Sequence, residues 1–129
     1  MPVGWADIKS ANSQGGAAIA GYDPVAYHTQ GVAIQGNSKF QYQWLNSQWR
    51  FTNETHLQLF KQDPERYMPE YGGYCARAVS LGYIRSINPQ VWSIIDDKLL
   101  LFHSESHKEK FMQRINQGVL DNANRHWAL

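Results

Sequence analysis

Residues 71–82 read YGGYCARAVSLG and hold the single cysteine of the 129-residue chain. The two glycines let the backbone turn sharply and approach another group closely. A helix that begins near Tyr74 would direct free N–H groups at the Cys75 sulfur and favour the thiolate, which is both a nucleophile and a soft-metal ligand. Ala78 and Val79 would instead place Cys75 on an apolar helix face, where single cysteines usually serve as small core residues. The stretch therefore leaves both roles open.

A second cluster of chemically useful side chains lies at residues 22–28. Tyr22, Asp23, Tyr27 and His28 supply a carboxylate, an imidazole and two phenols, all of which can bind a metal or form hydrogen bonds. A proline follows Asp23, so this residue is also expected to cap a short helical turn. In that interpretation the tyrosines pack in the core and His28 is an exposed loop residue. The sequence does not decide whether this cluster meets the cysteine.

The remaining histidines give weaker signals. His103 and His107 lie across an expected strand-to-helix boundary and have no carboxylate at metal-site spacing, which argues against a zinc site. His56 and His126 are expected on solvated helix faces. The glycine-rich phosphate loop, the Gly-x-Ser-x-Gly elbow and the His-Glu-x-x-His motif do not occur in the sequence. A single cysteine also excludes an intramolecular disulfide and a Cys-x-x-Cys redox site. A non-enzymatic function is therefore favoured.

Composition limits the function classes further. Hydrophobic residues make up 43% and charged residues 18% of the chain, which is ordinary for a folded protein. The net charge is +1 and no basic stripe is present, so nucleic acid and anionic membranes are poor partners. No apolar run is long enough for a membrane span, and the first twenty residues lack the apolar region of a signal peptide. The sequence as written predicts a cytoplasmic protein, or a periplasmic or secreted one if a leader peptide was removed.

Hydrophobic periodicity predicts an α+β fold. Alternation over 40–44 and 49–51 predicts a β-hairpin with its turn at Asn46-Ser47, and two apolar runs at 91–95 and 99–103 predict a second. Short strands are also expected at residues 17–20 and 32–35. Two hairpins that are each followed by helices are typical of a single small α+β domain. We expect this domain to span residues 17–129, after a lead-in at residues 1–16.

Three helix boundaries can be predicted from capping signals. Thr52 or Asn53 should cap a helix after the first hairpin, and an Asp-Pro pair at 63–64 should end that helix and start another turn. Ser106 and Glu109 form a capping-box pattern for a helix after the second hairpin.

Motifs along the chain resemble the YHS domain family. They are GYDPVAY at 21–27, WRF at 49–51 followed by DPERY at 63–67, and YGGYCA at 71–76. The match runs from about residue 18 to residue 127, and the ordered combination is more specific than any single motif. The resemblance implies a small α+β domain related to the TRASH and treble-clef metal-sensing modules of copper and heavy-metal transporters and regulators. Metal binding is the function usually suspected in that wider group.

The sequence departs from the metal-binding members at their cysteines. Those relatives carry Asp-Pro-Val-Cys where this chain has Asp-Pro-Val-Ala, so Ala26 stands at the position of a ligand cysteine. Residues 52–56 stand where those relatives carry a cysteine pair after their aromatic strand. A tetrathiolate zinc site is therefore excluded, and Cys75 is the one candidate ligand that the resemblance supplies. Asp23 and His28 are candidates because of their chemistry and not because of the family.

These observations lead to three hypotheses. The first is a module that binds a soft metal for handling or sensing, with the Cys75 thiolate completed by His28, Asp23 or a tyrosine. This ligand set favours copper(I) over zinc, because one thiolate is too few for a closed structural zinc site. The second is a thiol-based redox sensor or enzyme with Cys75 as nucleophile. The third is a protein or small-ligand docking module without metal, with an aromatic pocket formed by Tyr22, Tyr27, Tyr71 and Tyr74.

Overall fold

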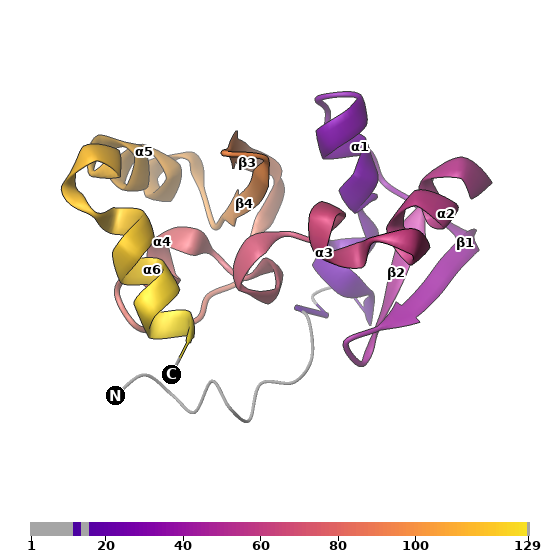
Figure 1. The fold of residues 1–129 in the computed structure, drawn as a ribbon, viewed down its shortest axis with the longest axis horizontal. Helices are drawn as coiled ribbons and strands as arrows, with labels where there is room; N and C mark the ends of the chain where they lie inside the picture. The colour runs from indigo at the N-terminus through magenta and orange to yellow at the C-terminus, as the bar shows by residue number, and fades with distance from the viewer. Residues whose placement is uncertain (1–11, 14–15, 129) are drawn as a thin grey trace.

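The computed structural model describes residues 12–13 and 16–128 of the chain. Six α-helices and two two-stranded antiparallel sheets form in this part of the chain, which confirms the predicted α+β class. Figure 1 shows β1, β2 and α2 at one end of the long axis and α5 and α6 at the other. Of the predicted lead-in 1–16, residues 1–11 and 14–15 lie outside the described residues. None of the described helices is long and apolar enough to cross a membrane.

The first hairpin pairs β1 (Asn37–Trp44) with β2 (Ser47–Phe51). Its turn is formed by Leu45 and Asn46, one residue earlier than predicted, and both have positive φ angles of 50° and 58°. Positive φ at both central residues is the pattern of a type I′ turn, whose twist matches that of the strands. The predicted alternation is confirmed, since Trp49 lies fully buried between two exposed or half-buried neighbours.

The second hairpin pairs β3 (Asn88–Ile95) with β4 (Lys98–Phe102) around a turn of Asp96 and Asp97. Both aspartates have positive φ, at 52° and 64°. Every residue of β4 after the first is buried, as expected for an apolar run without alternation. This hairpin therefore lies against the core, and its two-aspartate turn points a pair of acidic residues away from it.

The two short strands predicted before the first hairpin are wrong. Ala18–Gly21 is a 3-10 turn in which Ile19 and Ala20 have left-handed φ values of 45° and 58°. Residues 32–35 contribute one isolated bridge, from Gln35 to Tyr22. Ala17, Ala18 and Ile19 are buried in the core within a turn and not a strand, whereas residues 32–35 are exposed or half-buried.

Side chains cap the first two helices as predicted. Asp23 accepts hydrogen bonds from the first turn of α1 (Pro24–Thr29), and Asn53 caps α2 (Glu54–Gln62). The short α3 (Pro64–Tyr67) then begins at the second Asp-Pro pair. The α1 and α3 helices contact one another, and this contact positions the candidate site.

The C-terminal half contains α4 (Ala76–Ser80), α5 (Glu105–Gln113) and α6 (Val119–Trp127). The capping box predicted at Ser106 is wrong. Ser104 caps α5 instead, because its backbone is extended and its hydroxyl accepts the first-turn N–H of His107. The strand β4 ends at Phe102, two residues before Ser104, so α5 begins before the predicted capping box at Ser106.

The two glycines of the central stretch form a tight left-handed turn within Glu70–Gly73. A Cβ atom on Gly73 would lie 2.6 Å from a methyl carbon of Ile19, so no larger residue fits without a shift. Asn12 donates its backbone N–H to the Gly72 carbonyl at 2.8 Å and its side-chain amide to the Gly73 carbonyl at 3.0 Å. The predicted sharp turn and close approach are confirmed, and the turn holds Asn12, at the N-terminal end of the described chain, against the core.

Candidate functional site

Asp23 lies at the centre of a buried hydrogen-bond network. Its Oδ1 accepts the N–H groups of Val25 and Ala26 at 2.8 and 3.2 Å. Its Oδ2 accepts the N–H and the hydroxyl of Thr52, both at 2.9 Å, and lies 2.6 Å from Nδ1 of His56. A carboxylate offers about four lone-pair positions, so these contacts use its acceptor capacity. The predicted cap is confirmed, and the same side chain joins α1 to α2.

His56 was predicted on a solvated helix face, and this prediction is wrong. Its exposed fraction is 7%, and it occupies the inner face of α2 together with Phe60, four residues later. The i to i+4 spacing from His56 to Phe60 is a signal that could have placed both on one face. The contact between His56 and Oδ2 of Asp23 could not be predicted from sequence spacing, because 33 residues separate His56 from Asp23.

His28 occupies the last turn of α1 and is half-buried. Its ring stands edge-on to Tyr67 of α3, with 5.6 Å between centroids, and its Nε2 is buried without a hydrogen-bond partner in the described part of the chain. Burial lowers the pKa of His28 below its ordinary value. A hydrogen bond to the Tyr67 backbone and the charge of Asp97 oppose this effect, and the charge of Arg66 adds to it. The imidazole is therefore neutral at pH 7.

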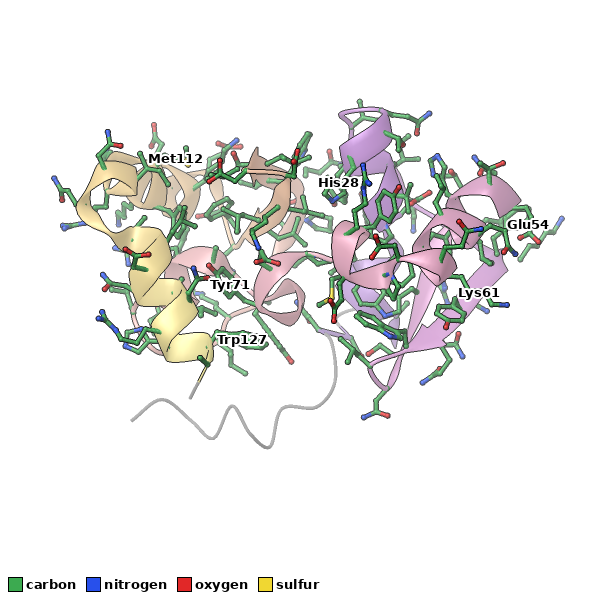
Figure 2. All side chains as sticks on the ribbon, viewed as in Figure 1. His28, Glu54, Lys61, Tyr71, Met112 and Trp127 are labelled. Atoms are coloured by element: carbon green, nitrogen blue, oxygen red, sulfur yellow. The ribbon has the colours of Figure 1, made fainter. Side chains whose placement is uncertain are left out.

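A cavity of about 390 Å³ opens beside this imidazole. Its lining comes from the end of α1, from α3 and from the β3–β4 turn, and consists of His28, Thr29, Arg66, Tyr67 and Asp97. Figure 2 shows His28 on α1 next to α3. The Arg66 guanidinium lies 5.6 Å from the centroid of the Tyr67 ring, within cation–π range. Neither Arg66 nor Asp97 makes an ion pair with another described residue.

Cys75 is fully buried, with an exposed fraction of 0%. It lies immediately before α4, where its N–H donates to the Arg85 carbonyl and its carbonyl accepts from Val79, both at 3.1 Å. Ala78 and Val79 share the core cluster with it, and a parallel bridge connects it to Leu101 of β4. The predicted apolar face is confirmed, and Cys75 does not line the cavity beside His28.

Two of the four predicted pocket tyrosines lie between α1 and β3. The Tyr22 hydroxyl accepts from the Gln90 side chain at 3.2 Å. Tyr27 is buried and donates its hydroxyl to the Pro89 carbonyl at 2.7 Å. Burial raises the pKa of Tyr27 far above its ordinary value, with smaller contributions from Tyr22 and Asp23. Tyr27 is therefore a neutral core residue.

The other two tyrosines lie against the end of α6. Tyr71 donates to the Asn124 side chain at 2.9 Å, and burial raises its pKa as it does for Tyr74. The rings of Tyr71 and Tyr74 lie 6.2 and 6.4 Å from Trp127, and Figure 2 shows Tyr71 and Trp127 close together. Tyr22 and Tyr27 thus have different partners from Tyr71 and Tyr74.

The predicted metal ligands have different surroundings. Cys75 lies in the core, His28 beside the cavity, and Asp23 in the network with His56. Among the residues that the structure describes, no group of at least three His, Cys, Asp and Glu side chains is placed to hold a metal ion. Copper(I) or zinc binding through these residues stays a prediction from the sequence.

His103 and His107 come together at the start of α5, with 5.0 Å between ring centroids. Each has a partner for Nδ1: the Ser86 carbonyl at 3.0 Å for His103, and the Ser104 hydroxyl at 2.7 Å for His107. This pair was recognised in the sequence, but the contact between the rings was not.

Sequence reasoning missed Arg66 and Asp97. Arg66 lies within the DPERY motif at 63–67, but the motif does not indicate that its side chain faces Asp97, and their meeting depends on how the second hairpin packs beside α3. The missed residues are the charged groups of the cavity beside His28. No family model, curated protein or solved structure matches the chain. The resemblance to the YHS domain family therefore stays a prediction from the motifs.

Proposed function

We propose that the protein is a binding module for a small zwitterionic molecule of the free amino acid type, which occupies the cavity beside His28. One observation carries this proposal. Arg66 and Asp97 line the same cavity from different elements, and neither is paired with another described residue. The cavity therefore presents one positive and one negative group to whatever enters it.

The chemistry of these two groups suits opposite ends of one ligand. The planar guanidinium of Arg66 can bind a carboxylate through two parallel hydrogen bonds, and its contact with the Tyr67 ring restricts its orientation. The Asp97 carboxylate can accept hydrogen bonds from an ammonium group. The neutral imidazole of His28 adds to the same lining a polar group that carries no charge. A ligand with only one charge would leave the opposite protein charge without a partner.

Cavity size limits the ligand to a small molecule. Ligand pockets in proteins have volumes of roughly 300–1,000 Å³. At about 390 Å³ this cavity lies near the lower end of that range, so it suits a single metabolite better than a nucleotide or a folded partner.

The proposal can be tested by following backbone amide resonances during titration with each of the common free amino acids. We expect at least one of them to cause saturable shifts in α1, α3 and the β3–β4 turn, with a dissociation constant of about 1 mM or below. The same amino acid with its amino and carboxyl groups blocked should cause none. Arg66→Gln and Asp97→Asn should each weaken binding by about tenfold or more, through loss of a charge-assisted contact.

Matched controls separate the cavity from general effects of charge. Arg114→Gln and Asp63→Asn remove the same charges at exposed positions outside this cavity and should leave the affinity unchanged. Asparagine tolerates the left-handed backbone of residue 97, so Asp97→Asn should keep the turn. Absence of saturable binding by every amino acid, or equal binding of the blocked forms, would contradict the proposal.

The predicted copper(I) or zinc site needs a separate measurement. A metal at Cys75 would have to reach a sulfur in a fully buried residue. Titration with copper(I) against a competing chelator, in the wild type and in Cys75→Ala, tests this directly. A copper affinity that falls in Cys75→Ala but not in Arg66→Gln would support the metal hypothesis. An unchanged affinity would leave Cys75 as a core residue.

A further inference from the structure

A second cavity lies at the opposite end of the molecule, where α4, the 3-10 turn Ile115–Gln117 and the beginning of α6 meet. Its volume is about 180 Å³. The polar lining residues are Arg77, Ser80, Arg114, Gln117 and Asn122. No carboxylate belongs to the lining, which distinguishes this cavity from the one beside His28.

The two arginines have no anionic partner. Neither Arg77 nor Arg114 makes an ion pair with any described residue. The Nε atom of Arg77 is buried and has no hydrogen-bond partner in the described part of the chain. A buried donor without a partner is unfavourable, and the penalty is larger when the group is charged. The structure therefore contains a positive group that an anion in this cavity would satisfy.

The surroundings of Arg77 are positive as well. Burial is the main cause that lowers the pKa of His107, and the neighbouring charges of His103, Arg85, Lys110 and Arg77 lower it further. Five basic side chains, Arg77 among them, therefore lie near one another at this end of the molecule.

We propose that this cavity binds a small oxyanion of the phosphate class between Arg77 and Arg114. Guanidinium groups match the oxygens of phosphate in a bidentate arrangement. The cavity is too small for a nucleotide, so the bound group is inorganic phosphate or the phosphate of a simple monoester.

Two further side chains of the lining, Asn122 and Ser80, differ in whether they can donate a hydrogen bond to the anion. The Oδ1 of Asn122 accepts a hydrogen bond from Arg125, which leaves its Nδ2 group free to donate to an anion. Ser80 donates its hydroxyl to the Arg77 carbonyl at 2.6 Å, so it fixes the last turn of α4 and is not an additional donor. Donors to the anion therefore come from the two arginines and from the side-chain amides of Asn122 and Gln117.

The experiment is titration of the full chain with sodium phosphate at constant ionic strength, with sodium chloride as the comparison and backbone amide resonances as the readout. We expect saturable shifts in α4, α6 and the turn between α5 and α6. Arg114→Gln and Arg77→Gln should each weaken binding by about tenfold or more, and Arg77→Lys should weaken it less because the charge is kept. Arg66→Gln, in the other cavity, should have no effect.

A parallel titration with glycerol 3-phosphate distinguishes the two sources of the phosphate group. Tighter binding of the monoester would identify a phosphorylated small molecule as the ligand, and equal or weaker binding would identify the free anion. Chloride shifts equal to those from phosphate would show an adventitious ion only, and would overturn the proposal. Unchanged phosphate affinity in Arg114→Gln would also overturn it. This variant decides the matter even if Arg77→Gln does not fold, because residue 114 is exposed.

Discussion

The carboxylate of Asp23 connects three parts of the chain that are distant in sequence. It caps α1, binds the backbone and hydroxyl of Thr52 after β2, and contacts His56 within α2. Because Asp23 is fully buried and its partners Val25, Ala26 and His56 are buried as well, water cannot replace it as the hydrogen-bond acceptor of these three residues.

Replacement of Asp23 by alanine should therefore be strongly destabilising. We expect Asp23→Ala to lower the free energy of unfolding by about 3 kcal/mol or more, since several buried donors lose their partner. Asp23→Asn should lose less, because one oxygen can still accept. Urea unfolding measures both. Asp63→Ala is the matched control, since Asp63 also precedes a proline but is exposed and its side chain makes no capping hydrogen bond. We expect a change within about 0.5 kcal/mol there, and similar losses in both variants would contradict this role for Asp23.

The buried position of Cys75 predicts that its thiol is protected. In the native protein a chromogenic disulfide reagent should react with it slowly, at a rate limited by opening of the core, and the reaction should become fast in urea. Cys75→Ser should lower the free energy of unfolding by about 1–3 kcal/mol, because it buries a hydroxyl that needs a partner. Rapid, stoichiometric reaction without denaturant would contradict this and support the redox hypothesis.

Among the secondary-structure elements, the turn of the first hairpin contains one residue in a strained backbone conformation. Leu45 and Asn46 both have left-handed φ values, and leucine is poorly suited to this conformation. The double change Leu45→Asn and Asn46→Gly should raise the free energy of unfolding by about 1 kcal/mol. Leu45→Ala is the control, because alanine keeps a Cβ atom and hence the strain. Thermal unfolding should show a higher midpoint only in the double variant, and an equal gain in Leu45→Ala would contradict the explanation.

The first hairpin could be predicted from the sequence because alternation reports strand geometry directly, and the second could be predicted from two apolar runs on either side of a polar turn. The segment at 17–20 could not, since Ile19 takes a left-handed conformation where it packs against Gly73, far along the chain. The same distinction applies to the candidate site. The cap at Asp23 is local and was predicted, whereas the charged lining from Arg66 and Asp97 depends on tertiary packing that no local pattern reports.

At the scale of the whole molecule, two histidines should make stability depend on pH. Burial is the largest cause that lowers the native pKa of both His28 and His107, whereas the unfolded chain keeps a value of about 6.5. Between the lowered value and about 6.5 the unfolded state binds more protons than the native state, so the free energy of unfolding falls as pH decreases through this window.

The His28 contribution can be isolated by urea unfolding from about pH 7.5 to about pH 5. His28→Gln should show a smaller loss of stability on acidification than the wild type, and the double variant with His107→Gln a smaller loss still. Identical pH dependence in all three proteins would show that other groups are responsible.

The positions of the tryptophans give the molecule separate optical reporters. Of the five tryptophans, Trp44 and Trp49 belong to the first hairpin, Trp92 belongs to β3 and Trp127 belongs to α6. Trp49 is fully buried, 5.1 Å from the Phe60 ring, so its emission should shift to longer wavelength when the first hairpin opens. Variants that keep tryptophan only in the first hairpin, or only at Trp92 in β3, would then report each hairpin independently. Coincident fluorescence transitions would establish that the two sheets, which share no strand, unfold as one cooperative unit.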